Sequence, residues 1–151
     1  YFDWPGLYDL MTAWATKHKY TIYESLYKDK TSKEGFAERE IKWYVEKKVD
    51  RMHRYKIYID YKMWDCQKVE VTKDGETKTL DRGRFRIQVR SEVDKDYQGL
   101  FRGSKFWEKA WGLYARMTNI EYNFDHWDIV YNQMFAFMDE VKTFLDTYAK
   151  G

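Results

Sequence analysis

The apolar residues near the C-terminus recur at intervals of three and four, which is the repeat of one face of an α-helix. The main row consists of Trp127, Val130, Met134, Phe137, Val141, Phe144 and Tyr148. A second row lies beside it and consists of Tyr131, Phe135, Met138 and Leu145. Together they form a face wider than the seam of a two-helix coiled coil. We therefore predict a helix over 127–148 that closes the core against a sheet.

Two shorter stretches show the same helical spacing. Near the N-terminus, Asp3 precedes Trp4 and Pro5, and an acidic N-cap followed by proline in the first turn marks a helix start. This predicts a helix over about residues 4–18. Ser104 is a candidate N-cap for a further helix. The apolar positions of this predicted helix are Phe106, Ala110, Leu113, Tyr114 and Met117.

Between these helices, apolar and polar residues alternate with a period of two, the pattern of half-buried strands. Strands are predicted over 20–27, 41–45, 55–63, 69–71, 77–80 and 85–89. Asp74 and Gly75 predict a hairpin turn, and 81–83 predicts another turn. About five or six consecutive strands with short connections should form an antiparallel meander, because parallel neighbours need long crossovers.

The order of these elements predicts a single α+β domain over residues 1–151. It has an N-terminal helix, an antiparallel meander sheet and two C-terminal helices packed on one face of the sheet. No repeat or linker-like stretch divides the chain, and the length suffices for a proper core. No run approaches the roughly 20 apolar residues of a membrane span, and no signal peptide is visible.

Charge and cysteine content narrow the class of protein further. The chain has 27 basic and 25 acidic residues and a net charge of +2, which is too balanced to indicate nucleic-acid binding from composition alone. Cys66 is the single cysteine, so an internal disulfide and a multi-cysteine zinc site are excluded. This usage fits a reducing cytosol, and we expect a cytoplasmic protein.

Several fragments of the chain occur together in a recognisable order. They are WPGLY at 4–8, EIKW at 40–43 followed by KKVD at 47–50, VEVTKDG at 69–75, RGR at 82–84 with DY at 96–97, and EVKTFL at 140–145. In these fragments the chain resembles a group of small uncharacterised proteins from archaeal genomes. The resemblance implies a cytoplasmic α+β domain of an archaeon and brings no activity, cofactor or catalytic residue with it.

The polar face of the predicted sheet is the main candidate for function. If Ile41, Ile57 and Phe85 face the helices, alternation places a set of aromatic and basic residues on the opposite side. The set consists of Tyr44, Tyr58, Trp64, Lys56, Lys62, Arg84, Arg86 and Arg90. Aromatic residues and arginine mark protein interfaces, and the same mixture stacks bases and holds phosphates in sheet-based RNA readers.

We therefore expect a non-enzymatic interaction module with a protein partner, and an RNA-binding or ribosome-associated protein is the alternative. Acidic residues on the same face dilute its charge, so a solvated face with cross-strand ion pairs is the structural alternative. A third alternative is a small apolar ligand bound between sheet and C-terminal helix. Met134, Phe137 and Met138 would line that site, although such stripes are usually core.

Motifs for catalysis are lacking. The eight glycines are scattered, and the three histidines lie far apart in sequence. His126 between Asp125 and Asp128, with Glu121 one turn earlier, could be a general base or help hold a cation. Helix capping already explains these acids.

Cys66 and His53 could form a nucleophile–base pair if adjacent strands brought them together. Asp65 beside the thiol would raise its pKa and oppose this role. We accordingly expect no enzymatic activity, no cofactor and no bound metal.

Overall fold

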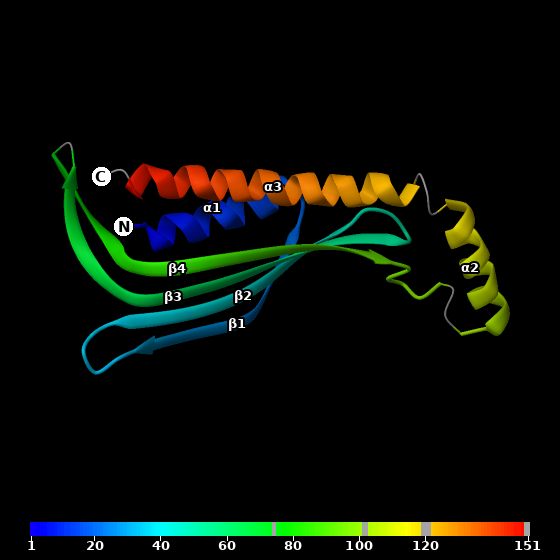
Figure 1. The fold of residues 1–151 in the computed structure, drawn as a ribbon, viewed down its shortest axis with the longest axis horizontal. Coiled ribbons are helices and arrows are strands. Elements are labelled where there is room, and N and C mark those ends of the chain that lie inside the picture. Colours follow the sequence, from blue (N-terminus) through cyan, green and yellow to red (C-terminus); the bar gives the residue numbers. More distant parts are fainter. Residues whose placement is uncertain (74, 101–102, 119–121, 150–151) are drawn as a thin grey trace.

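The computed structural model describes residues 1–73, 75–100, 103–118 and 122–149. In chain order the elements are α1 (Trp4–Lys17), β1 (Thr21–Thr31), β2 (Ala37–Lys48), β3 (His53–Lys73), β4 (Glu76–Lys95), α2 (Lys105–Thr118) and α3 (Tyr122–Ala149) (Figure 1). The sheet has the order β1-β2-β3-β4, and each neighbouring pair is antiparallel. The predicted α+β class and antiparallel meander are confirmed.

The described residues form four strands, so the prediction of five or six is wrong. The difference arises in β3 and β4, which run for 21 and 20 residues. The turn predicted at 81–83 lies inside β4, where Asp81 pairs with Lys68 and also bridges to Phe2 near the N-terminus. The hairpin predicted at Asp74 and Gly75 connects the two strands, although Asp74 itself lies outside the described residues.

A bulge in β3 replaces the predicted turn. The register of β3 against β4 shifts between Trp64 and Gln67, and Asp65 has a positive φ of 54°. Bulges bend strands and increase their twist, and the β3–β4 hairpin curves strongly toward the side of the helices (Figure 1). Gly83 lies opposite the bulge and serves close packing rather than a turn.

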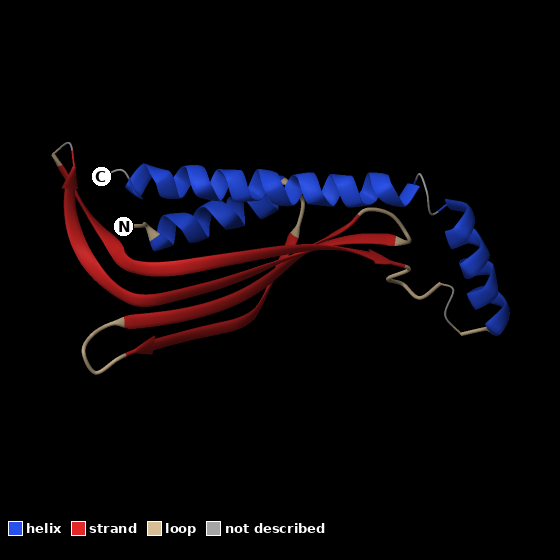
Figure 2. Cartoon of the chain, viewed as in Figure 1, coloured by secondary structure: helices blue, strands red, loops and turns tan. Residues whose placement is uncertain are grey.

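Helices α1 and α3 cover one face of the sheet and leave the other face bare (Figure 2). The carboxylate of Asp3 accepts a hydrogen bond from the Gly6 amide at 3.1 Å, so the predicted N-cap of α1 is confirmed. The ring centroids of Trp14 on α1 and Phe137 on α3 lie 4.9 Å apart. The contact between these two side chains joins the helices in a core on the covered face of the sheet.

The wide apolar face predicted for α3 is only partly buried. Val130, Phe137 and Val141 are at most 1% exposed, as predicted. Trp127, Tyr131 and Phe135 are 44%, 50% and 47% exposed, against expectation. The contacts between α1 and α3 begin near Phe137 and continue toward the C-terminus. Among the described residues, α1 therefore does not flank the earlier part of α3.

The prediction that both C-terminal helices pack on the sheet is wrong for α2. This helix lies past the end of the sheet, away from α1 (Figure 1). Its predicted N-cap is right, because Ser104 Oγ accepts a hydrogen bond from the Phe106 amide at 3.2 Å. Helical spacing shows that a helix has an apolar face, but it does not say which surface covers that face.

Candidate functional site

The bare face of the sheet carries all eight residues that were predicted from alternation. Tyr58 lies between the fully buried Ile57 and Ile59, so it points away from the core. Register places the other predicted residues on the same side. The cross-strand pairs are Tyr44 with Tyr58, Tyr58 with Arg90, Lys62 with Arg86, and Trp64 with Arg84, and Lys56 precedes Tyr58 by two positions.

A row of aromatic rings crosses this face. Tyr23, Tyr44 and Tyr58 occupy paired positions on β1, β2 and β3, and Arg90 on β4 completes the row. The rings of Tyr23 and Tyr44 stack at 4.8 Å with an interplanar angle of 12°. The Arg90 guanidinium carbon lies 4.4 Å from the centre of the Tyr58 ring. Sequence reasoning missed Tyr23, because only the register of β1 brings it into the row.

Trp64 and the basic residues around it form a second aromatic and cationic cluster on the bare face, near the bulge in β3. The Lys62 ammonium lies 5.4 Å from the Trp64 ring centre, and the Arg86 guanidinium carbon lies 5.8 Å from it. A shallow depression beside the ring is lined by Trp64, Arg84 and Phe85. Arg84 forms an ion pair with Asp65. Two cationic groups, from Lys62 and Arg86, therefore lie within cation–π distance of the indole.

Charge is distributed unevenly over the face. Near the start of β3, Arg54 contacts Glu46 at 3.3 Å and Asp94 at 2.5 Å, and Lys56 contacts Asp94 at 3.5 Å. Burial alone would raise the pKa of Asp94, but these cations outweigh it and lower the pKa. Within the described part of the chain, Lys62, Arg86 and Arg90 form no ion pair. The half of the face near Trp64 is therefore the cationic half.

The apolar side of α2 is a surface that sequence reasoning did not single out. Phe106, Trp107, Leu113, Tyr114 and Met117 are 45–80% exposed. At 100° per residue they fall within one sector of the helix, on the side away from Gly112. We call these five side chains the α2 surface. The spacing was visible in the sequence, but the exposure of these side chains was not.

Basic residues border the α2 surface. Lys105, Lys109 and Arg116 lie four and seven positions apart, so they form one row along the helix, and Glu108 is the acid among them. Helix α3 also exposes aromatic side chains, and the rings of its Tyr131 and Phe135 lie 4.6 Å apart. This end of the molecule combines exposed aromatic side chains with a cationic border.

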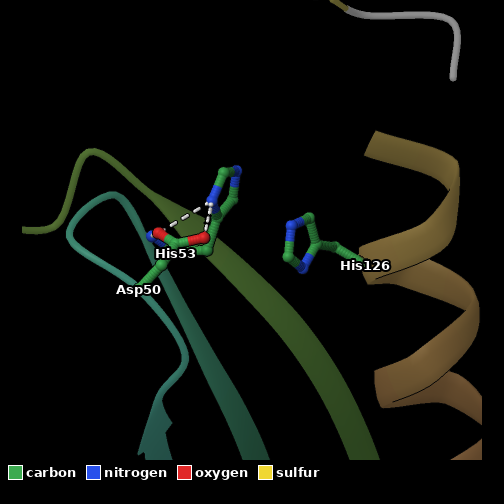
Figure 3. A group of neighbouring side chains, drawn as sticks. All are labelled: Asp50, His53 and His126. Atoms are coloured by element: carbon green, nitrogen blue, oxygen red, sulfur yellow. Dashed lines mark hydrogen bonds and ion pairs between the residues drawn. The ribbon is translucent and has the colours of Figure 1, made fainter. Parts of the chain in front are cut away.

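A histidine cluster joins the start of β3 to the start of α3 (Figure 3). The rings of His53 and His126 stack with centroids 4.2 Å apart and an interplanar angle of 15°. His53 Nδ1 lies 3.0 Å from a carboxylate oxygen of Asp50, and His126 Nδ1 lies 2.7 Å from the Tyr55 hydroxyl. Burial and the neighbouring His53 lower the pKa of His126.

Among the described residues, the side chains grouped closely with the His126 imidazole are Asp50 and His53 rather than Asp125 or Asp128. Asp125 is in the first turn of α3, where an acid suits the helix dipole, and Asp128 is exposed. Glu121 lies outside the described residues. The imidazole instead points from α3 toward Asp50 and His53 (Figure 3). Sequence spacing missed this group because its members come from two distant segments.

Cys66 and His53 are not brought together. Both belong to β3, thirteen positions apart, and an extended strand of that length spans roughly 40 Å. Burial and the nearby Asp81 raise the pKa of the Cys66 thiol, which opposes a role as nucleophile. Of the residues expected to line an apolar-ligand site, Phe137 is fully buried, with its ring centroid 4.9 Å from that of Trp14.

None of the helices, over the residues that the structure describes, has the length and apolar character needed to cross a membrane. The resemblance to archaeal proteins stays a prediction. No protein-family model, curated protein or solved structure matches the chain.

Proposed function

We propose that the protein is a non-enzymatic interaction module that binds another protein. The observation that carries the proposal is the α2 surface. Five large apolar side chains exposed to solvent on one helix are unusual for a monomer, and such patches mark sites that a partner covers. Within the described residues the helix also makes few contacts with its own sheet, so the sheet does not cover that surface.

The spacing on α2 suits insertion into a groove of the partner. Phe106 and Leu113 lie seven positions, or about two turns, apart, and Met117 follows one turn later. This is the anchor pattern of an amphipathic helix bound in an apolar groove. The bordering Lys105, Lys109 and Arg116 favour acidic residues around that groove. The proposed partner is therefore a folded protein with an apolar groove and an acidic rim.

The test uses two neighbouring positions on α2. Leu113→Glu places a charge within the α2 surface, whereas Gly112→Glu places the same charge on the other side, where a Cβ meets nothing within 4 Å. Each protein serves as bait in nuclease-treated native lysate, and the captured protein is then titrated as a purified component. We expect Leu113→Glu to weaken its binding by about 1–4 kcal/mol. Gly112→Glu should weaken it less, because its carboxylate lies beside Lys109 and Arg116 at the border and not within the α2 surface.

Equal capture by both baits would contradict the proposal. Loss of wild-type capture after nuclease treatment would also contradict it. Self-association of the wild type that Leu113→Glu abolishes would assign the surface to a second copy of this chain instead.

The bare sheet face is a second proposed contact surface, as the sequence predicts. Tyr58 and Trp64 are half-buried by their neighbours rather than by a helix of this chain. Rings that already stack on one another or lie beneath cations present mainly their edges to a partner. This arrangement supports a protein contact over base stacking, which requires open ring faces.

RNA binding by the same face is the second candidate function. The observation that favours it is the cationic group Lys62, Arg86 and Arg90, which forms no ion pair within the described residues. RNA binding would weaken steeply with salt. It would be lost on substitution of the basic residues, whereas protein binding would depend chiefly on the aromatic ones.

A further inference from the structure

We propose that Asp50, His53 and His126 form a binding site for a divalent transition-metal ion, with Zn²⁺ as the ion best matched to the donors. One ligand atom from each of the three residues lies within 4.8 Å of the others. Two imidazoles and one carboxylate are a common zinc donor set. The same donors bind Co²⁺ and Ni²⁺, which makes those ions usable probes.

The three side chains combine burial with access. His53 and His126 are 6% and 8% exposed, while Asp50 is exposed. An ion can therefore enter past the carboxylate and reach two largely dry imidazole ligands. Burial restricts the motion of the two imidazoles, whereas the side chains of two exposed histidines would be mobile in water.

Local structure holds the first two ligands in place. Asp50 lies in the turn between β2 and β3, where its Oδ1 accepts hydrogen bonds from the amides of Met52 and His53 at 2.7 Å each. The carboxylate oxygens lie 3.0 and 3.1 Å from His53 Nδ1. Two ligands on a tetrahedral ion at about 2.1 Å are roughly 3.4 Å apart, so an ion can take the place of the proton between them.

Tyr55 orients the third ligand. Its hydroxyl lies 2.7 Å from His126 Nδ1. If Nδ1–H donates to this oxygen, the ring coordinates through Nε2, and the hydrogen bond fixes the tautomer as outer partners of zinc histidines do.

Metal binding requires a small adjustment of His126. The two rings are nearly parallel, so their nitrogen lone pairs do not yet meet at one point. Coordination would require the His126 ring to tilt about its hydrogen bond to Tyr55, so that Nε2 turns toward the ion while Nδ1 keeps its partner. Three protein ligands leave a fourth tetrahedral position for water. The bound ion would tie the β2–β3 turn to the start of α3.

The test titrates the full-length, metal-stripped protein with Zn²⁺ by calorimetry and with Co²⁺ by visible absorption. Three variants accompany the wild type: His126→Gln, Asp50→Asn and His18→Gln. His18 lies at the end of α1, outside the cluster, and is the matched control for loss of a histidine. Asp50→Asn retains an oxygen acceptor for the turn amides, so it tests the ligand even if His126→Gln fails to fold.

We expect one Zn²⁺ per chain and tetrahedral Co²⁺ bands in the wild type and in His18→Gln. Affinity should fall at least tenfold in Asp50→Asn and His126→Gln. Zn²⁺ should raise the melting temperature of the wild type more than that of Asp50→Asn. The absence of stoichiometric binding, or an equal loss of affinity in His18→Gln and Asp50→Asn, would overturn the proposal.

Discussion

Gly83 on β4 packs directly against Cys66 in the bulge of β3. A Cβ at position 83 would lie 2.7 Å from the Cys66 sulfur, 2.9 Å from the Cys66 Cα and 2.9 Å from the Trp64 carbonyl oxygen. These approaches are shorter than van der Waals contact allows, and two of the three atoms belong to the backbone. The bend of the β3–β4 hairpin therefore depends on the missing side chain.

Gly83→Ala should lower the free energy of unfolding by about 1–3 kcal/mol, because the strands must separate to admit the methyl group. Chemical denaturation measures this change. Gly112→Ala is the control: a Cβ there meets nothing within 4 Å, and alanine in a helix is favoured over glycine. Equal effects of the two substitutions would show that the contact at Gly83 has no importance.

Cys66→Ala should not rescue Gly83→Ala, since the clash with the Cys66 Cα and the Trp64 carbonyl would persist. On its own, Cys66→Ala should leave partner binding unchanged, because the thiol is buried and has a raised pKa. Binding assays on Cys66→Ala and on the wild type check this expectation. A loss of binding in Cys66→Ala would indicate thiol chemistry.

Phe137→Ala should lower the free energy of unfolding by about 3–5 kcal/mol, since the ring is fully buried against Trp14. Phe135→Ala is the matched control on the same helix. Its ring is 47% exposed, so the change should stay within about 0.5 kcal/mol. Thermal melting compares the two variants. An unchanged melting midpoint in Phe137→Ala would contradict the core described above.

Asp94 should make the fold sensitive to acid. Burial opposes its ionisation, but the hydrogen bond from Arg54 and the charges of Arg54 and Lys56 lower its pKa below the ordinary value. Stability from a lowered carboxyl pKa is fully present above the unfolded-state pKa, about 3.9 for aspartate, and is lost as the pH falls through the folded-state pKa.

Asp94→Asn should therefore be less stable than the wild type at pH 7, and the difference should shrink toward pH 2. Denaturant titrations at a series of pH values measure it. A difference that is constant over this range would mean that the charge of Asp94 contributes nothing to stability.

Trp64→Ala and Tyr58→Ala should weaken binding at the sheet face by about 1–4 kcal/mol with little change in stability. Tyr27→Ala is the control, because this exposed tyrosine pairs with Ile41 and so lies on the other face. Titrations at two salt concentrations separate the two candidate functions. A steep fall with salt, together with larger losses in Lys62→Ala and Arg86→Ala, would favour RNA over a protein partner.

The sequence by itself determined the features that depend on neighbouring residues. Asp3, Pro5 and the spacing of α1 were enough to predict that helix, because capping and helical periodicity act within a few residues. Alternation around Tyr58 was enough to assign its face, because successive strand residues point to opposite sides.

Only the tertiary structure decided the features that depend on distant segments. The stacking of His53 on His126 joins positions 73 apart, and no local pattern encodes that distance. The bulge at Asp65 turned an expected turn at Gly83 into a close contact inside a long strand. The α2 surface shows the same limit: periodicity specifies an apolar face, but the covering of that face depends on where the rest of the chain lies.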